Sequence, residues 1–346
     1  MKISIGTNIK DGPWGGGNLF AINLRNFLVS KGHTVLTNLD HDDIDIILIT
    51  EPRKTSESSA YTHIDVKNYL NLINPDTLVM HRINECDERK NTNFVNKYLI
   101  EANKIADYTV FVSTWLKDLY NEQGLNRNNN HVILAGANKE IFNSSNKSNW
   151  QEGEKLKIVT HHWGANWNKG FEIYNYLDTL LDQEYWKDKI EFTYVGNLPN
   201  NFTFENATHI KPLSGKNLAN ELKKNHLYIT GSLKEPSGNH HIEAAQCGLP
   251  VMFINSGGVK EYCQGFGVEY TNLNIDEKIN YVLKNYSQLS KKMSEYPFSS
   301  DLMSEDFLNL FLEMYENKNN LISKRIIEKS TYFEKKLFKL RRSLKS

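Results

Sequence analysis

The chain has 346 residues, enough for about two domains, and 39% of them are hydrophobic, enough to fill sizeable cores. Its 41 basic and 41 acidic residues cancel, so the protein as a whole carries no positive charge with which to attract nucleic acid. The three cysteines, Cys86, Cys247 and Cys263, have no paired spacing, which argues against a disulfide framework or a zinc site.

Buried strand patterns alternate with helical patterns through the first half of the chain, as in a parallel α/β sheet. The strands are expected at 2–6, 34–36, 44–50, 77–80 and 107–114. The helices are expected at 18–30, 94–106 and 115–120. The strand at 44–50 is almost wholly apolar, which is typical of a sheet covered on both faces.

A glycine-rich segment, Gly15 to Gly17, separates the first strand from the first helix. Such a loop can bring backbone amides close to a ligand at a helix N-terminus. It lacks the Gly-x-Gly-x-x-Gly spacing of a dinucleotide site and the Lys-Ser/Thr pair of a P-loop. Taken alone, it fits a flexible turn equally well.

Ionisable residues crowd the run from His81 to Lys90, directly after the strand at 77–80. Because α/β folds place ligands at the carboxyl ends of strands, His81 is a candidate site residue. The alternative is that His81 only caps the strand and that the charged run is a solvated loop. The same run supplies four further candidates: Arg82, Glu85, Asp87 and Arg89.

The segment 143–150 is polar and poor in apolar residues, so we place a domain boundary there. This divides the chain into a first domain at 1–147 and a second at 148–296. Helices at 297–322 are expected to cross back to the first domain, and residues 323–346 form a basic tail.

The second half repeats the alternation of strands and helices. Strands are expected at 157–160, 190–195, 227–230 and 251–254, and helices at 171–181, 215–224, 239–247, 275–283 and 304–315. Lys169 precedes the first of these helices, and a cation at that position can neutralise a diphosphate. The adjacent His161 and His162 have no third residue at metal-ligand spacing, so no metal site is expected.

The most informative unit is the strand, loop, helix and strand at 227–254. Glu235 lies in its loop and Glu243 eight positions later in its helix. Ser237, Gly238 and Asn239 fall at the helix start, where free backbone N–H groups and the helix dipole favour an anion. Two such glutamates could be ordinary surface and helix acids, but the intervening glycine and the Gly-Gly-x-x-Glu that follows favour a ligand site.

These segments resemble GT-B fold glycosyltransferases, in particular the retaining family 4 enzymes (glycosyl transferases group 1). The resemblance covers roughly residues 1–315 in motif order. It rests on the Glu-x7-Glu motif of Glu235 and Glu243, on Lys169-Gly170, on the Lys-Gly-His-Thr-Val run at 31–35, and on 107–114. It implies two Rossmann-like, doubly wound α/β domains that face a central cleft. The first would bind the acceptor and the second the nucleotide-sugar donor.

The resemblance also implies roles for individual residues. In the family, the first glutamate of the motif contacts hydroxyls of the donor sugar, the second contacts the ribose, and the intervening amides contact sugar or phosphate. Carried over, the catalytic residues are His81, Lys169 and Glu235. The donor-binding residues are Gly16, Gly17, His162, Trp163, Lys169, Ser237, Gly238, Asn239, His240 and Glu243.

The sequence departs from the family at Gly164, near the position where an arginine normally precedes the lysine by about five residues. His161 or His162 could replace that cation, or an arginine of the first domain could reach in. No cofactor and no metal are expected, since Lys169 and helix-terminal amides would carry the diphosphate charge.

Residues 323–346 contain nine lysines and arginines against two glutamates, with apolar residues kept to one side. This pattern predicts a basic amphipathic helix suited to an anionic membrane surface, although an ordinary packed terminal helix is the alternative. No run reaches the roughly 18 apolar residues of a membrane span, and the N-terminus lacks the apolar core of a signal peptide. We therefore expect a cytoplasmic protein that is peripheral on the inner face of the membrane.

Together these features predict a retaining, metal-independent glycosyltransferase of the hexosyltransferase type. Its expected partners are a UDP- or GDP-sugar donor and a glycan or lipid-linked acceptor, without nucleic acid. By family analogy its setting would be surface polysaccharide or lipopolysaccharide assembly of the bacterial type. Two alternatives stay open: a non-catalytic nucleotide-sugar-binding subunit of a membrane assembly, and a GT-B nucleotide-sugar epimerase.

Overall fold

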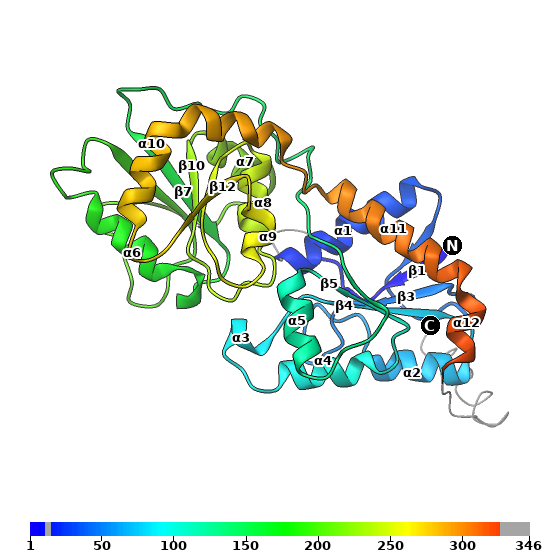
Figure 1. The fold of residues 1–346 in the computed structure, drawn as a ribbon. Coiled ribbons are helices and arrows are strands. Elements are labelled where there is room, and N and C mark those ends of the chain that lie inside the picture. Colours follow the sequence, from blue (N-terminus) through cyan, green and yellow to red (C-terminus); the bar gives the residue numbers. More distant parts are fainter. Residues whose placement is uncertain (11–14, 326–346) are drawn as a thin grey trace.

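The computed structural model describes residues 1–10 and 15–325 and shows two lobes, each built on a six-stranded parallel sheet (Figure 1). The strand order is β2-β1-β3-β4-β5-β6 in the first sheet and β12-β11-β10-β7-β8-β9 in the second. Each sheet is doubly wound, since its strand order reverses once, between β1 and β3 in the first lobe and between β7 and β10 in the second.

The strands of the first lobe are β1 (Lys2–Ile5), β2 (Thr34–Leu36), β3 (Ile46–Ile49), β4 (Leu78–Ile83), β5 (Tyr108–Phe111) and β6 (Asn130–Val132). Its helices are α1 (Gly16–Ser30), α2 (His63–Leu72), α3 (Asp87–Lys90), α4 (Val95–Asn103) and α5 (Thr114–Glu122). Strand β3 is buried throughout because alternate side chains enter different cores. Ile46 and Leu48 pack with α1 residues, whereas Ile47 and Ile49 pack with α2 residues.

Strand β4 continues to Ile83, three residues beyond its predicted end. Successive side chains of a strand point to opposite faces of the sheet. His81 therefore shares a face with Val79 and contacts α4, while Arg82 shares a face with Met80 and contacts α1. Because His81 and Arg82 are neighbours in β4, they point to opposite faces of the sheet, and it is Arg82 that faces α1.

The strands of the second lobe are β7 (Leu156–His162), β8 (Ile190–Gly196), β9 (Thr208–Ile210), β10 (Leu227–Thr230), β11 (Val251–Ile254) and β12 (Gly267–Tyr270). Its helices are α6 (Phe171–Leu180), α7 (Gly215–Lys223), α8 (Asn239–Gln246), α9 (Val259–Cys263) and α10 (Ile275–Lys292), with short 3-10 turns η1 (Trp167–Lys169) and η2 (Met293–Glu295). The predicted strands and helices of this half all occur, and α10 is longer than expected.

The last helices, α11 (Ser300–Glu316) and α12 (Lys318–Ser323), lie on the first lobe (Figure 1). Phe307 of α11 packs edge-on against Phe20 of α1, with ring centroids 5.2 Å apart. Arg325, just after α12, forms an ion pair with Asp107 and donates to the carbonyl oxygens of Pro75 and Thr77, each at 2.9 Å. Arg325 is thereby fixed to the first lobe.

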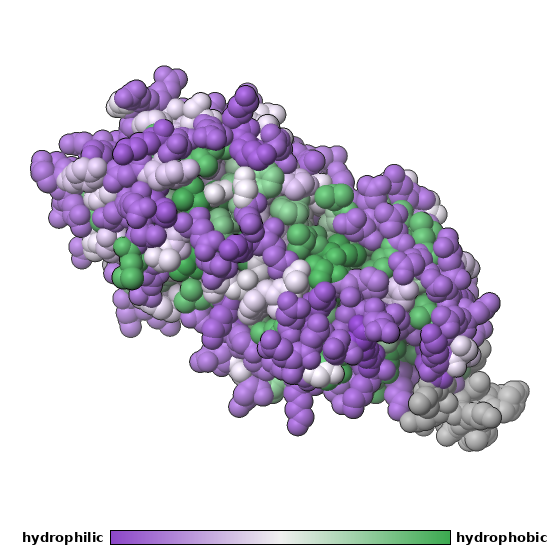
Figure 2. Space-filling model, in the orientation of Figure 1, coloured by the Kyte–Doolittle hydropathy of each residue, from purple (hydrophilic) through white to green (hydrophobic). Residues whose placement is uncertain are grey.

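Two passages of the chain cross between the lobes side by side. Ser300 N donates to Ala137 O at 2.8 Å, and Ala137 N donates to Phe298 O at 3.3 Å. Gly136 permits this approach, since a Cβ there would lie 2.0 Å from Ser299 O. Hydrophilic side chains cover most of the visible face, and hydrophobic ones gather near the junction of the lobes (Figure 2).

Residues 326–346, which hold most of the predicted basic tail, lie outside the described residues, so its contact with a membrane stays a prediction. Within 1–10 and 15–325, no helix has both the length and the apolar character needed to cross a membrane.

Candidate active site

The candidate site lies where β7 and β10 run side by side in the second sheet. The loop after β7 carries Lys169 in η1, and the loop after β10 carries Glu235. This is the point at which the strand order reverses, and in open α/β sheets ligands bind outside the carboxyl ends of the strands at such a point. The order of the strands therefore brings together two residues that are 66 positions apart.

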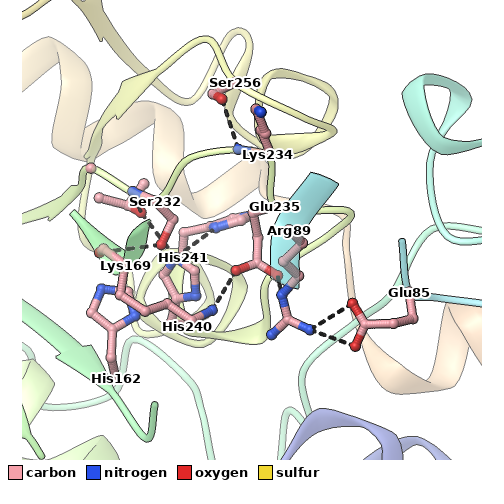
Figure 3. Close-up of polar contacts among 12 residues, drawn as sticks. Glu85, Arg89, His162, Lys169, Ser232, Lys234, Glu235, His240, His241 and Ser256 are labelled. Atoms are coloured by element: carbon pink, nitrogen blue, oxygen red, sulfur yellow. Dashed lines mark hydrogen bonds and ion pairs between the residues drawn. The ribbon is translucent and has the colours of Figure 1, made fainter. Parts of the chain in front are cut away.

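Glu235 is held between a cation from each lobe (Figure 3). Its Oε2 lies 2.5 Å from Nζ of Lys169, and its Oε1 lies 3.1 Å from Nε of Arg89 on α3. Burial raises the pKa of the Glu235 carboxyl, but Lys169 and Arg89 together outweigh burial and lower that pKa to about 2. Glu235 is therefore ionised at neutral pH although it is only 4% exposed.

Arg89 and Lys169 belong to a chain of alternating charges. Arg89 Nη1 lies 3.1 Å from Oε2 of Glu85, and Lys90 Nζ lies 2.7 Å from the same oxygen. The order is Lys90, Glu85, Arg89, Glu235 and Lys169, so three cations face two carboxylates. This chain of charges carries one more positive than negative charge, which favours an anionic ligand.

The loop that carries Glu235 is fixed by the glycine pair before α9. Gly258 N donates to the Glu235 carbonyl oxygen at 2.9 Å. Gly257 has a φ of 68°, and a Cβ there would lie 2.3 Å from that same carbonyl oxygen. The Gly-Gly of the predicted motif therefore allows two backbone segments to approach and sets the position of the carboxylate.

Two helix N-termini, one from each lobe, lie close together beside this cluster. Helix α8 begins after Gly238, and α1 begins after Gly15; neither has a side-chain cap or an acidic residue in its first turn. The two ends are close, because a Cβ on Gly16 would lie 3.1 Å from the side chain of Asn239. Uncapped amides and two positive dipole ends suit an anion such as a diphosphate. Gly17 lies beside them, with open space where its Cβ would be.

Four buried histidines lie beside the cluster of Lys169 and Glu235: His161, His162, His240 and His241. His162 Nε2 lies 2.7 Å from the Tyr174 hydroxyl, and the His162 and His240 rings are 4.5 Å apart. Burial lowers the pKa of His162 and of His240, and it lowers the pKa of His241 to about 3. These three rings are neutral at pH 7, so His162 does not supply the cation that the sequence lacks near Gly164. Arg89 of the first lobe does reach the site.

Glu243, the second glutamate of the motif, is 7% exposed inside α8. Its Oε2 lies 3.0 Å from Nε2 of His161. Ser237 stands half-buried in the loop between the two glutamates. The structure therefore gathers the motif residues of the second lobe around one buried region.

Two predicted site residues do not join this cluster. His81 is fully buried inside the first lobe, where its Nδ1 lies 3.1 Å from Nδ2 of Asn103, and burial lowers its pKa to about 3. It lies there because β4 continues past it and directs it toward α4. Trp163 is 56% exposed, and its carbonyl oxygen accepts from Asn197 at 2.8 Å.

Glu261 and Tyr262, which the sequence did not mark as functional, both join the lobes. The Glu261 carboxylate accepts from the backbone N–H groups of Thr114 and Trp115, at 2.8 and 3.0 Å, at the start of α5. The Tyr262 hydroxyl donates to Val112 O at 2.5 Å. Helix α9 of the second lobe thus caps a helix of the first. The only sequence signal was the acid three residues after Gly258.

Across 1–10 and 15–325, no group of three or more His, Cys, Asp or Glu side chains is placed to hold a metal ion. The independence of the reaction from metal stays a prediction.

Comparisons with known proteins bear on this site. Residues 200–298, which include the loop of Glu235 and all of α8, match the family model "Glycosyl transferases group 1". This part of the chain is therefore similar to that family. A search of curated proteins gave no match.

Solved structures resemble nearly the whole chain. A glycosyltransferase from Rickettsia africae has a TM-score of 0.65 and 14% identity, covering 91% of this chain and 99% of its own. Anabaena HepE in complex with UDP and glucose has a TM-score of 0.66 and 12% identity, covering 90% and 100%. The fold is GT-B. This confirms the two predicted doubly wound domains and their facing arrangement.

A third structure with the GT-B fold is an alpha-glucosyltransferase in complex with UDP and a 13-mer DNA containing an HMU base. Its TM-score is 0.60 at 12% identity, covering 90% of this chain and 99% of that one. At such identities the likeness establishes the fold alone.

Proposed function

We propose that this protein is a glycosyltransferase that moves a sugar from a nucleotide-sugar donor to a hydroxyl group of an acceptor, with retention of the anomeric configuration. The observation that carries the proposal is Glu235, a buried carboxylate held between Lys169 and Arg89 beside two uncapped helix N-termini. A nucleoside diphosphate linked to a sugar has the matching groups: a charged diphosphate and neighbouring hydroxyls.

In this proposal the diphosphate lies at the start of α8, on the side that faces Gly16 and Gly17 of α1. Lys169 and Arg89 turn from Glu235 to the diphosphate oxygens, and Glu235 accepts hydroxyl groups of the donor sugar. Glu243 and the His161 beside it hold the ribose. The ion pairs among these side chains thus hold them in place until the donor replaces the side-chain partners.

The chemical step breaks the bond between the sugar C1 and the diphosphate oxygen and forms a bond from C1 to the acceptor oxygen. The acceptor proton leaves with the nucleoside diphosphate. Negative charge grows on the departing oxygen, and preorganised cations and amides there stabilise the transition state more than the ground state. Closure of the lobes over the site excludes water and limits hydrolysis of the donor.

Arg89 takes the place of the arginine that the sequence lacks near Gly164. It comes from the first lobe, so the second cation is in place only when the lobes are together. Glu85 acts as a positioning residue, since its carboxylate holds Arg89 Nη1 at 3.1 Å. In this way the leaving group is fully stabilised only in the closed enzyme.

For the substrates, we propose a UDP-sugar donor before a GDP-sugar, since UDP is the nucleotide bound by the similar Anabaena and DNA-bound proteins named above. The acceptor is proposed to be a glycan or a lipid-linked hydroxyl, in surface polysaccharide or lipopolysaccharide assembly. Residues 323–346 would bring the enzyme to the membrane. We propose that the reaction needs no metal.

The test begins with a thermal-shift screen of UDP- and GDP-sugars, followed by product analysis with and without saccharide and lipid-linked acceptors in EDTA. Acceptor-dependent release of nucleoside diphosphate, with the donor anomer kept in the product by NMR, supports the proposal. Epimerised donor without acceptor indicates the epimerase instead. Tight nucleotide binding without turnover of any donor indicates the non-catalytic subunit. Glu243→Ala is expected to abolish the shift, and an undiminished shift refutes its ribose contact.

A further inference from the structure

Arg82 is a buried arginine without a counter-charge. It is 6% exposed. Its guanidinium stacks on the ring of Phe20, with 3.9 Å from the guanidinium carbon to the ring centroid. Among the residues that the structure describes, that guanidinium has no hydrogen-bond or ion-pair partner. Arginine is almost never buried to this extent unless an anion is beside it, because removing the charge from water is costly.

The other buried cations of the cleft and core differ from Arg82 in this respect. Arg325 pairs with Asp107, and both Lys169 and Arg89 pair with Glu235. For Arg82, burial lowers the pKa of the guanidinium to about 10, and only the charge of Tyr262 opposes this. The fold thus keeps a positive charge in a place where the described residues provide nothing to neutralise it.

Arg82 faces the boundary between the lobes. Phe20, on which it stacks, is one turn past the start of α1, the helix whose Gly16 meets Asn239 of the second lobe. Burial raises the pKa of Tyr262 on α9, and the charge of Arg82 opposes that rise. The guanidinium therefore lies against α1, one turn from the end of that helix that meets the second lobe.

We propose that Arg82 and the first turn of α1 form an anion-binding subsite on the first lobe, separate from the cluster of Lys169, Glu235 and Arg89, that holds a phosphate or carboxylate group of a substrate. The start of α1 has no side-chain cap and no acid in its first turn, so its amides add donors to the guanidinium. A planar guanidinium can hold two oxygens of such a group at once.

The anion could belong to the donor or to the acceptor. Only this choice of two sources rests on the proposed function. The diphosphate of the donor could extend from the start of α8 toward α1. Alternatively, an acidic acceptor could place its own phosphate or carboxylate there. The two sources predict different binding behaviour for UDP.

The test compares Arg82→Met with Arg25→Met, a matched change at a half-buried arginine of α1 whose one side-chain bond is to Asn26. Calorimetry measures the binding of uridine, of UDP, and of inorganic phosphate to protein saturated with UDP. If the donor diphosphate occupies the subsite, Arg82→Met weakens UDP about tenfold or more and leaves uridine unchanged. If the acceptor anion occupies it, UDP is unchanged and phosphate no longer binds. Unchanged binding of both UDP and phosphate overturns the proposal.

Thermal unfolding without ligand separates this role from a structural one. Arg82→Met removes a buried charge and no partner, so Tm is expected to stay the same or to rise. A fall of several degrees would show that Arg82 supports the fold, and would also overturn the proposal. Arg82→Lys, which keeps the charge but not the planar fork, should retain part of the anion affinity. None of these measurements needs turnover. The proposed subsite can therefore be supported even if no sugar transfer is found, and it can be refuted even if transfer is found.

Discussion

The two lobes bring charge to their common cleft in different ways. In the second lobe Lys169 is paired with Glu235, and His161 with Glu243, within one domain. The first lobe contributes two arginines, Arg82 at the end of β4 and Arg89 in α3. Arg89 is paired across the cleft, and Arg82, which stacks on Phe20, has no ion-pair or hydrogen-bond partner among residues 1–10 and 15–325. The second lobe thus pairs its cations within itself, whereas Arg89 is paired by the other lobe and Arg82 is left without a counter-charge.

Neutralising Glu235 should have the largest effect, because Glu235 pairs with one cation from each lobe. Glu235→Gln leaves Lys169 and Arg89 without the carboxylate that joins them, and it replaces one of the two oxygens proposed to accept sugar hydroxyls by an NH2 donor. We expect the transfer rate to fall by roughly 100-fold or more. Initial rates with a UDP-sugar measure this, with the exposed Glu277→Gln as the control. A rate within twofold of the wild type would remove Glu235 from the site.

The next effect concerns Arg89, with its neighbour Lys90 as an internal control. Both side chains contact Glu85, but only Arg89 also reaches Glu235. Because charged hydrogen bonds contribute about 1.5–3 kcal/mol, Arg89→Met should weaken UDP by roughly 10- to 100-fold, while Lys90→Met changes it little. Calorimetry with UDP and uridine tests this. Equal losses in both variants would mean that the charge chain, and not Arg89 itself, supports binding.

A smaller effect is expected where α9 caps α5. Glu261→Gln weakens a carboxylate bond to two amides at a helix N-terminus, a loss of about 1 kcal/mol. The lobes should then separate more readily, so the radius of gyration from small-angle scattering rises and UDP restores it. Glu269→Gln is the control, since Glu269 pairs only with Lys260 of its own lobe. Identical scattering from wild type and Glu261→Gln would show that this cap does not hold the lobes together.

The smallest effect is one of pH and stability, at His81. Its pKa in the folded protein is about 3, against 6.5 for an unperturbed histidine, because of burial. The unfolded chain therefore binds this proton first, and the wild type loses about 1.4 kcal/mol of stability per pH unit from this group as pH falls from 6.5 toward 3. The contribution is fully present above pH 6.5.

Substituting His81→Leu removes that slope, so its stability relative to the wild type should improve between pH 7.5 and 5.5. Urea unfolding at both values measures the difference, with the exposed His41→Leu as the control. A stability difference that is constant with pH would contradict the buried neutral state. A loss of turnover with unchanged stability would instead indicate that His81 contacts the reacting sugar.

The positions of the strands and the second-lobe motif could be predicted from the sequence because they depend on local patterns. Glu235, the start of α8 and Glu243 are close in the chain, so their spacing carries the information. The pairing of Arg89 with Glu235 could not be predicted, since it joins residues of different lobes.

The position of His81 shows a second limit. Ending the strand at residue 80 placed this histidine at the edge of the sheet, and the three further residues of β4 place it in the core. The same extension turns Arg82 toward α1. Helix α2 was also missed, although the Thr62 and Asp65 pair forms a capping box at its start.

Arg325 gives the chain after α12 a fixed point of departure. Because this side chain is tied to Asp107 and to the carbonyl oxygens of Pro75 and Thr77, Arg325 moves with the first lobe. Any force applied to the chain at Arg325 is therefore carried first into that lobe. If the first lobe binds the acceptor, as proposed, the nucleotide-binding lobe would be the part left free to swing.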